Sequence, residues 1–515
     1  MGFKFALLTL LPFFVANAYA ADVFYTMNVT NAVVAPDGNP RSSIIAGQFG
    51  GVPLVANKGD TLHINVTNNL FDPTMRRSTS IHWHGLFQDR TASEDGPSFV
   101  NQCPIAPGHF YHDPNDPQKD LWDVDDASTI ITLADWYHTP AEQLMAQFKQ
   151  DGHEPVPGSG LINGVGRYKG GPTGTVGGSQ CATRKAISVC PAILDSFMPT
   201  TDHPKLHSFR VVNMAAFAAF TFSIDGHTFD VIETDGIATV PLTVSNFEIH
   251  AAQRYSVVLN ANQPVNNYWI NAPMTVQGSS AILDKENVKA ILRYVGAPNS
   301  DPTTSGGGGS SGKGGSSAGP LQEYQLQTLI NPGAPGGSAP ADRTIDLNFD
   351  AAGNGLWEVN GVSYVPPDLP TLLKIINGAT TANDFNVTEN TFVLERGQVV
   401  ELRIHGADHG ITHPFHLHGH AFDVVKSASG PTNYVNPPRR DVIGVDQGGV
   451  IIRFRADNPG PWFLHCHIDW HLEAGLAVVF AEAPADQRQG PQSQIIPAAW
   501  NDLCPIYNNL TQELQ

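Results

Sequence analysis

Residues 462–471 read Trp-Phe-Leu-His-Cys-His-Ile-Asp-Trp-His, and this run constrains the fold more than any other part of the chain. A strand projects alternate side chains to opposite faces, so His465 and His467 would point one way and Cys466 the other. A thiolate with imidazoles and only a weak axial partner is typical of a blue-copper electron-transfer site. Histidines scattered beside a buried cysteine would explain the run less well, because few sites need so many nitrogen and sulfur ligands. The run therefore predicts a strand that separates two kinds of metal site.

The first twenty residues have the pattern of a secretory signal. A lysine precedes an almost wholly apolar run at residues 6–16, and Ala-Tyr-Ala at 18–20 is a small-x-small cleavage site. The apolar run is too short for a transmembrane helix, and no later stretch reaches membrane-spanning length. We expect a mature chain that begins near Ala21 and is secreted into an oxidising extracellular space. Candidate glycosylation sequons stand at Asn28, Asn65, Asn386 and Asn509.

The composition narrows the class of protein. The 515 residues leave room for two to four domains. Charged residues make up only 15% of the chain, whereas 49 glycines and 39 prolines favour many short strands and turns. The net charge of −19 argues against nucleic acid and anionic membranes as partners. We expect an acidic extracellular protein that is a monomer.

Five cysteines in a secreted chain indicate that disulfides form. If Cys466 is a metal ligand, four remain. Cys103 and Cys504 stand in similar Cys-Pro-Ile contexts, and Cys181 and Cys190 could close a small local loop. Two disulfides and one metal thiolate would account for all five, although the sequence leaves the connectivity open.

The chain repeats one β-pattern three times. A short predicted strand precedes each of the two His-x-His motifs, at residues 82–84 and 416–418. Residues 225–232 match residues 419–425 but have no His-x-His motif nearby. We therefore expect an all-β chain of three related β-sandwich domains, with metal chemistry in the first and third.

Taken together, these motifs resemble the multicopper oxidases, and among them the fungal laccases. The resemblance covers nearly all of the mature chain and is most specific at residues 81–85, 95–108, 130–138, 413–424 and 458–476. It implies three consecutive cupredoxin-like Greek-key domains and four copper ions per chain: one type 1, one type 2 and two type 3. The expected segments are a signal peptide (1–20), domain 1 (21–140, truncated after about residue 111), domain 2 (141–300), a Gly/Ser-rich linker (301–320) and domain 3 (321–515), which carries the type 1 site.

The resemblance also implies a role for each ligand. The type 1 ligands would be His413, Cys466 and His471, with Leu476 as a non-coordinating axial residue that favours a higher reduction potential. The type 2 ligands would be His82 and His416, one type 3 copper would have His84 and His467, and the other would have His418 and His465.

Two acidic residues match positions that relay protons in the family. They are Asp95 and Asp441. Turn capping and an ion pair with Arg439 or Arg440 would explain these carboxylates equally well.

The chain departs from the family in domain 1. The family has a further His-x-His motif there, but Tyr111 runs almost directly into residues 112–117, and about two or three strands are missing. Each type 3 copper would then lack one ligand. His109 and His112 would not replace the motif, because residues three apart point to opposite faces of a strand.

Two further positions differ from the family pattern. The cysteine that usually bridges to the missing segment matches Ala216, although Cys181 or Cys190 could be that partner instead. The acidic residue that laccases often use to hold a phenol would fall near Phe217, which leaves the substrate preference open.

Three hypotheses follow. The leading one is a secreted laccase-like multicopper oxidase, in which benzenediol-type phenols give single electrons to type 1 copper beside His471 and dioxygen is reduced to water. The second is a non-catalytic or impaired homologue that keeps type 1 copper but lacks a complete trinuclear cluster. The third is a metal-ion oxidase of the same fold, for which Glu473 is the one obvious carboxylate near His471 in the sequence. Lignin degradation, pigment formation and detoxification are all compatible with these residues.

Overall fold

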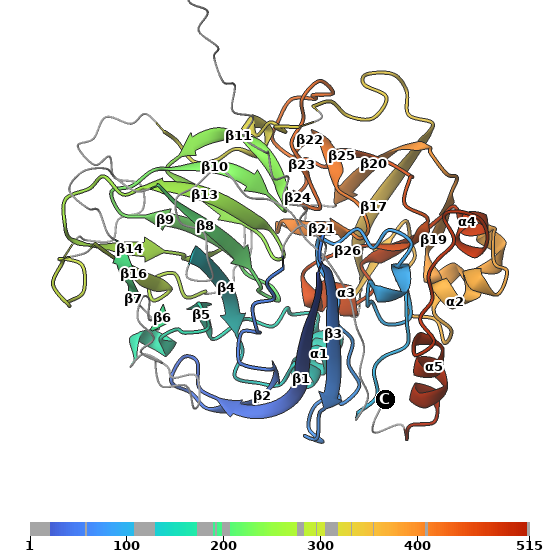
Figure 1. Ribbon diagram of the computed structural model, residues 1–515, viewed down its shortest axis with the longest axis horizontal. Helices are drawn as coiled ribbons and strands as arrows, with labels where there is room; N and C mark the ends of the chain where they lie inside the picture. Colours follow the sequence, from blue (N-terminus) through green and yellow to red (C-terminus); the bar gives the residue numbers. More distant parts are fainter. Residues whose placement is uncertain are drawn as a thin grey trace, which may run out of the picture.

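The computed structural model describes residues 21–56, 59–107, 129–171, 189–190, 193–197, 206–275, 283–294, 296–303, 318–330, 332–353, 355–406 and 410–511. These residues form five sheets, with a few short helices between them (Figure 1). The helices are α1 (Ala141–Asp151), α2 (Thr371–Ile376), α3 (Asp469–Glu473), α4 (Pro484–Arg488) and α5 (Trp500–Asn508), with 3-10 turns η1 (Ala92–Glu94), η3 (Tyr168–Gly170), η4 (Glu323–Gln325), η5 (Ala382–Asp384) and η6 (Val387–Glu389). Within this part of the chain, no helix has the length and apolar character needed to cross a membrane.

The first sheet has the strand order β2-β1-β3 and is drawn in dark blue at the bottom of Figure 1. Its strands are β1 (Asp22–Val34), β2 (Arg41–Ala46) and β3 (Thr61–Asn69). Leu62, Ile64 and Val66 alternate with half-buried residues along β3, so one face of the sheet is apolar. That face packs against Leu372 of α2 and Trp500 of α5. The C-terminal part of the chain therefore completes the core around the first sheet.

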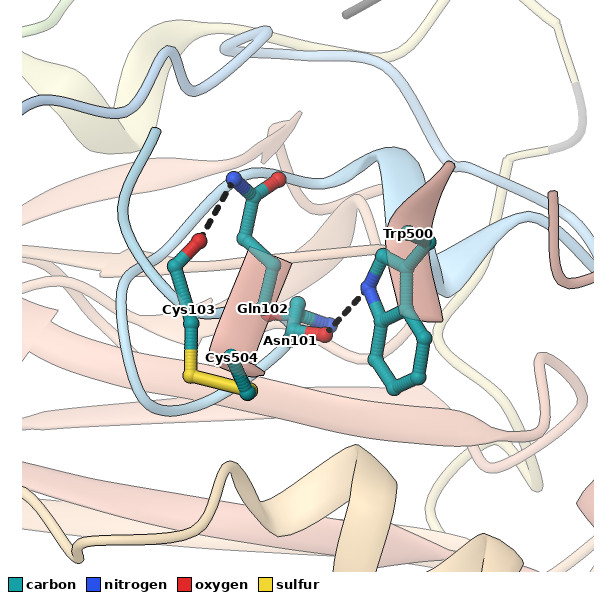
Figure 2. Close-up of a disulfide and its surroundings, with 5 residues drawn as sticks. All are labelled: Asn101, Gln102, Cys103, Trp500 and Cys504. Atoms are coloured by element: carbon teal, nitrogen blue, oxygen red, sulfur yellow. Dashed lines mark hydrogen bonds between the residues drawn. A yellow bond between two sulfur atoms is a disulfide. The ribbon is translucent and has the colours of Figure 1, made fainter. Parts of the chain in front are cut away.

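A disulfide between Cys103 and Cys504 fixes this arrangement (Figure 2). It joins residues that are 401 positions apart in the sequence. Beside it, Trp500 Nε1 donates to the carbonyl of Asn101 at 3.0 Å. The Asn101 side chain donates in turn to the carbonyl of Pro461 at 3.2 Å. The Asn101–Cys103 loop is thus tied both to α5 and to the strand that carries Cys466.

The middle of the chain forms a sandwich of two sheets, drawn in green on the left of Figure 1. One sheet has the order β11-β10-β13-β8-β4-β5, and the other has the order β12-β9-β14-β16-β7-β6, with β15 paired to β9. The strands of this sandwich are β4 (Ile130–Trp136), β5 (Ser159–Ile162), β6 (Val189–Cys190), β7 (Ile193–Phe197), β8 (Leu206–Asn213), β9 (Ala219–Ile224), β10 (Phe229–Thr234), β11 (Ile237–Val244), β12 (Asn246–Ile249), β13 (Arg254–Asn260), β14 (Asn267–Asn271), β15 (Met274–Thr275) and β16 (Lys289–Tyr294). Phe209, Phe222 and Phe247 from the two sheets meet in one buried core.

The last part of the chain forms a second two-sheet sandwich, drawn in orange and red. Its sheets have the orders β18-β17-β20-β25-β22-β23 and β19-β27-β26-β21-β24. The strands are β17 (Arg343–Gly353), β18 (Leu356–Val359), β19 (Thr391–Leu394), β20 (Val399–Gly406), β21 (His413–Leu417), β22 (Phe422–Lys426), β23 (Arg439–Arg440), β24 (Val442–Val445), β25 (Val450–Arg455), β26 (Gly460–Cys466) and β27 (Ala477–Glu482). β26 lies at the centre of its sheet, with β21 on one side and β27 on the other.

Several expectations fall outside the described residues. These are the signal peptide, the missing segment around Tyr111 with His109 and His112, and Cys181. Cys190 lies in β6. The domain boundaries, the second disulfide and the glycosylation of Asn28, Asn65, Asn386 and Asn509 stay predictions.

Candidate metal centre

The thiolate site is built around the end of β26. All seven residues of this strand are buried, and its last residue is Cys466. The neighbouring strand β21 begins with His413, and α3 carries His471. The Cys466 Sγ atom lies 3.7 Å from His413 Nδ1 and 3.6 Å from His471 Nδ1, and the two Nδ1 atoms are 3.1 Å apart. The three type 1 residues that the sequence predicts therefore meet in a tight triangle.

The triangle has the size that a first-row metal requires. Imidazole and thiolate bind such metals at about 2.0–2.3 Å, so three donors around one ion lie roughly 3.6 Å apart. All three residues are at most 1% exposed. One soft sulfur and two imidazole nitrogens in a dry pocket suit copper, and the Cys466 thiol is free of any disulfide.

Apolar side chains close the pocket around these donors. The Trp357 ring lies 4.5 Å from the His471 ring and 4.8 Å from the His413 ring, centre to centre. Leu476 is fully buried in the same core, and its carbonyl accepts a hydrogen bond from the Cys466 amide at 3.1 Å. Burial raises the pKa of the Cys466 thiol, so the thiolate needs a cation beside it to form in this pocket.

A cluster of six histidines lies on the other side of the same strands. His416 and His418 come from the end of β21, His465 and His467 come from the end of β26, and His82 and His84 come from the loop that follows Ile81. The His84 and His416 rings are 3.8 Å apart, and the His82 and His418 rings are 4.0 Å apart, centre to centre. His418 Nε2 lies 3.0 Å from His465 Nε2. The first and third parts of the chain thus face each other and contribute two and four imidazoles.

The free nitrogens of this cluster point to metal ions. Among the described residues, His82 Nε2, His416 Nε2 and His467 Nδ1 are buried without a hydrogen-bond partner. Buried polar atoms are normally satisfied, so several orphaned nitrogens that face one another indicate ligands for ions. Burial lowers the pKa of His465 to about 3 and that of His467 to about 4, which keeps both imidazoles neutral and able to bind a metal.

Asp95 positions two of these imidazoles. Its backbone carbonyl accepts a hydrogen bond from His82 Nδ1 at 2.7 Å, and its carboxylate accepts one from His418 Nδ1 at 2.8 Å. Each ring is thereby turned so that its Nε2 faces the cluster. The next residue, Gly96, lies directly against the backbone of Ile81. Its φ is +93°, and an added Cβ would lie 1.7 Å from the Ile81 carbonyl oxygen. Only glycine fits there.

Asp441 is held by a residue that the sequence did not suggest. Its carboxylate receives two hydrogen bonds from Arg254 of β13, at 2.6 and 2.8 Å. The expected ion pair with Arg439 or Arg440 is wrong, because Arg439 pairs with Asp423 and Arg440 with Asp235. Both arginines lie on β23, and their guanidinium groups pair with these other carboxylates. Burial raises the pKa of Asp441 to about 6, although Arg254 opposes this shift.

Glu154 is a second residue that sequence reasoning missed. It follows α1 in the middle part of the chain, and its Oε1 atom lies 2.8 Å from His471 Nε2. The two residues are 317 positions apart, and no sequence motif connects them. The one available signal was the pair of acidic residues in the segment just before Pro155, which could have been noted as candidates for a substrate contact. Phe217, the position matched to the family's acidic residue, is instead 3% exposed in the apolar core.

Comparisons with known proteins agree with this geometry. Three family models described as multicopper oxidase match residues 28–119, 127–297 and 364–486. The chain is 47% identical to Laccase-4 of Thanatephorus cucumeris over 92% of both chains, and 41% identical to Laccase-2 of Agaricus bisporus over 97% of this chain and 98% of that one. Among solved structures, the laccase of Botrytis aclada matches with a TM-score of 0.77 and 29% identity, covering 96% of this chain and 93% of that one. Fet3p, a multicopper oxidase that functions in iron import, matches with a TM-score of 0.77 and 25% identity over 96% and 98% of the two chains.

These matches confirm the expected fold class of three cupredoxin-like β-sandwich domains. Two His-rich clusters of the described residues suit the copper that the family binds. The chain therefore belongs to the multicopper oxidases and is a laccase-type copper oxidase.

Proposed function

We propose that this chain oxidises benzenediol-type phenols one electron at a time beside His471 and uses the electrons to reduce dioxygen to water. Each electron leaves its phenol together with one proton, and four of each convert one dioxygen into two waters. The observation that carries the proposal is the adjacency of the two clusters. Cys466 faces one side of β26, and His465 and His467 on either side of it enter the histidine cluster.

Copper bound at the two clusters would supply the one-electron chemistry and the site for dioxygen. His413, Cys466 and His471 would hold the type 1 ion, and the non-coordinating side chain of Leu476 beside them would favour a higher reduction potential. The covalent path from Cys466 to either neighbouring histidine is only a few bonds long. This path would let electrons pass from the thiolate site to the histidine cluster through the residues next to Cys466.

In the histidine cluster we assign His82 and His416 to type 2 copper. We assign His84 with His467, and His418 with His465, to the two type 3 ions. The short contact between His418 and His465 supports the second pair. We assign proton relay to Asp95 and Asp441. The Asp95 carboxylate bonds to His418 Nδ1, and the backbone carbonyl of Asp441 bonds to His416 Nδ1.

We propose that the protein is secreted, glycosylated and monomeric, as its signal sequence and sequons suggest. The missing segment of domain 1 would remove one ligand from each type 3 ion. For that reason the impaired homologue, which keeps type 1 copper but lacks a complete trinuclear cluster, stays the main rival. A metal-ion oxidase is a further candidate, and the carboxylate of Glu154 beside His471 is the observation that favours it.

One purified sample separates these functions. Copper per chain, the visible absorption of the copper thiolate, the near-ultraviolet type 3 band and oxygen uptake with a benzenediol are measured together. We expect four coppers per chain, both absorption bands and uptake of oxygen. A Cys466→Ser variant serves as the control, because it should lose the visible band and the uptake together. A blue protein that lacks the type 3 band and consumes no oxygen would establish the rival.

A further inference from the structure

The edge of the thiolate site that faces away from Cys466 is covered by one carboxylate. His471 turns Nδ1 toward Cys466 and Nε2 toward Glu154, at 3.6 and 2.8 Å. His471 is completely buried, whereas the side chain of Glu154 is 23% exposed. Glu154 is therefore the outermost group of the hydrogen-bonded chain that leads from Cys466 to the solvent.

The position of Glu154 is set by the end of α1. The helix stops at Gly152, whose φ of +71° is left-handed and whose amide bonds to the Phe148 carbonyl at 2.8 Å. Phe148 anchors the helix in the core beside the thiolate site. Two buried prolines, Pro155 and Pro157, follow Glu154 and limit the backbone. The backbone on both sides of Glu154 is therefore fixed, and it holds the Glu154 carboxylate over His471.

Other carboxyl groups lie around this edge. Asp469 and Glu473, on the helix that carries His471, are exposed. Asp135 is buried behind them, where it accepts hydrogen bonds from three successive backbone amides, including that of Phe217. A donor that approaches His471 therefore meets the Glu154 carboxylate first, and its negative charge attracts cations and repels anions.

We propose that Glu154 selects electron donors by charge and favours aromatic donors that carry a protonated amine over donors that carry a carboxylate. The inference rests on the proposed electron uptake at His471. It assigns the substrate class of that site to cationic phenols. Position 217, where the family pattern would place an acid, contributes only an apolar side chain to the core.

Three catechols with the same ring test the proposal: dopamine (ammonium), 4-methylcatechol (neutral) and 3,4-dihydroxyphenylacetate (carboxylate). The rate at which each bleaches the visible thiolate band is measured without oxygen. Dopamine should bleach the band roughly tenfold faster than 3,4-dihydroxyphenylacetate, because one partly screened charge at close range has an effect of this size. In Glu154→Gln, which keeps the length and one oxygen of the side chain, the preference should fall to about threefold or less. A change in reduction potential alters all three rates alike and leaves this ratio unchanged.

The matched control is Asp151→Asn, three residues away on the same segment. Asp151 is an exposed carboxylate whose side chain accepts a hydrogen bond from the His153 amide. This variant should keep the roughly tenfold preference, because one screened surface charge contributes little. An equal loss in both variants would overturn the proposal, since selection would then be a property of the whole surface.

A second readout needs no copper. The dissociation constants of two inert analogues, 2-(3,4-dimethoxyphenyl)ethylammonium and 3,4-dimethoxyphenylacetate, are measured on the copper-free chain by titration in NMR. The cation should bind more tightly in the unchanged chain and lose this advantage in Glu154→Gln. Equal binding of the two analogues would contradict the proposal.

Failure of the proposed function is distinguishable from failure of this inference. If the chain consumes no oxygen but bleaches in the expected order, the oxygen-reducing function fails and charge selection by Glu154 holds. If ferrous iron bleaches the band faster than dopamine and this advantage is lost in Glu154→Gln, the carboxylate serves a metal ion and the assignment to amines is wrong.

Discussion

The disulfide between Cys103 and Cys504 offers the sharpest test of how the two ends of the chain cooperate. We consider the double variant Cys103→Ser and Cys504→Ser. The bridge closes a loop of 401 residues, for which chain entropy sets a ceiling of about 6 kcal/mol, and losses of native disulfides are usually about 2–5 kcal/mol. We expect a loss in the lower half of that range.

The reason for the smaller value is that α5 stays partly held. Trp500 and Leu503 remain buried against the first sheet, and the bond from Trp500 Nε1 to the Asn101 carbonyl does not involve the bridge. The chain has several domains, so the loss should appear in the first unfolding transition and leave later ones unchanged.

Removal of the disulfide should also weaken metal binding by the histidine cluster. Asn101 ties the same loop to Pro461 at the start of β26, and the loop belongs to the part of the chain that provides His82 and His84. When the bridge is absent, we expect the histidine cluster to release copper before the thiolate site does, because the latter is built within the third domain alone.

The assay combines urea unfolding, followed by tryptophan fluorescence, with copper content and the visible band during dialysis against a weak chelator. Limited proteolysis should cut the variant first near α5. The reasoning is refuted if the first transition moves by less than about 1 kcal/mol, or if both clusters lose copper together.

Three further changes have expected outcomes. Asp95→Asn weakens the bond to His418, so the histidine cluster should lose copper affinity by about 10–100-fold while the visible thiolate band persists; equal loss at both sites in a chelator titration would contradict this. Gly419→Ala places a Cβ 2.4 Å from the buried Trp462 ring at a left-handed φ of +68°, so thermal unfolding should show a loss of about 2–4 kcal/mol, and an unchanged melting temperature would disprove the clash. The pKa of His465 and His467 is lowered from the ordinary value of 6.5 to about 3 and about 4, so the unfolded copper-free chain takes up more protons; its free energy of unfolding should fall as the pH drops from about 6.5 toward about 4, and urea unfolding that shows no fall refutes the shift.

The sequence determined the thiolate site almost completely. The alternation of side chains in a strand fixes the opposite directions of Cys466 and its two neighbours, and this local rule holds wherever the strand lies. The His416-x-His418 motif at the end of β21 likewise directs both imidazoles toward one cluster. His82 and His84 lie in a loop and not on a strand, so strand geometry does not place them.

Only the tertiary structure decided which side chains from distant segments contact the residues of the two clusters. Arg254 reaches Asp441, and Glu154 reaches His471, across separations of 187 and 317 residues. No periodicity or motif encodes such a pair, because an ion pair depends on how two sandwiches dock and not on either local sequence. The neighbours of Arg439 and Arg440 were misjudged for the same reason. The sequence motifs thus indicated the residues of the two clusters, whereas the charges that surround them were set by the packing of one domain against another.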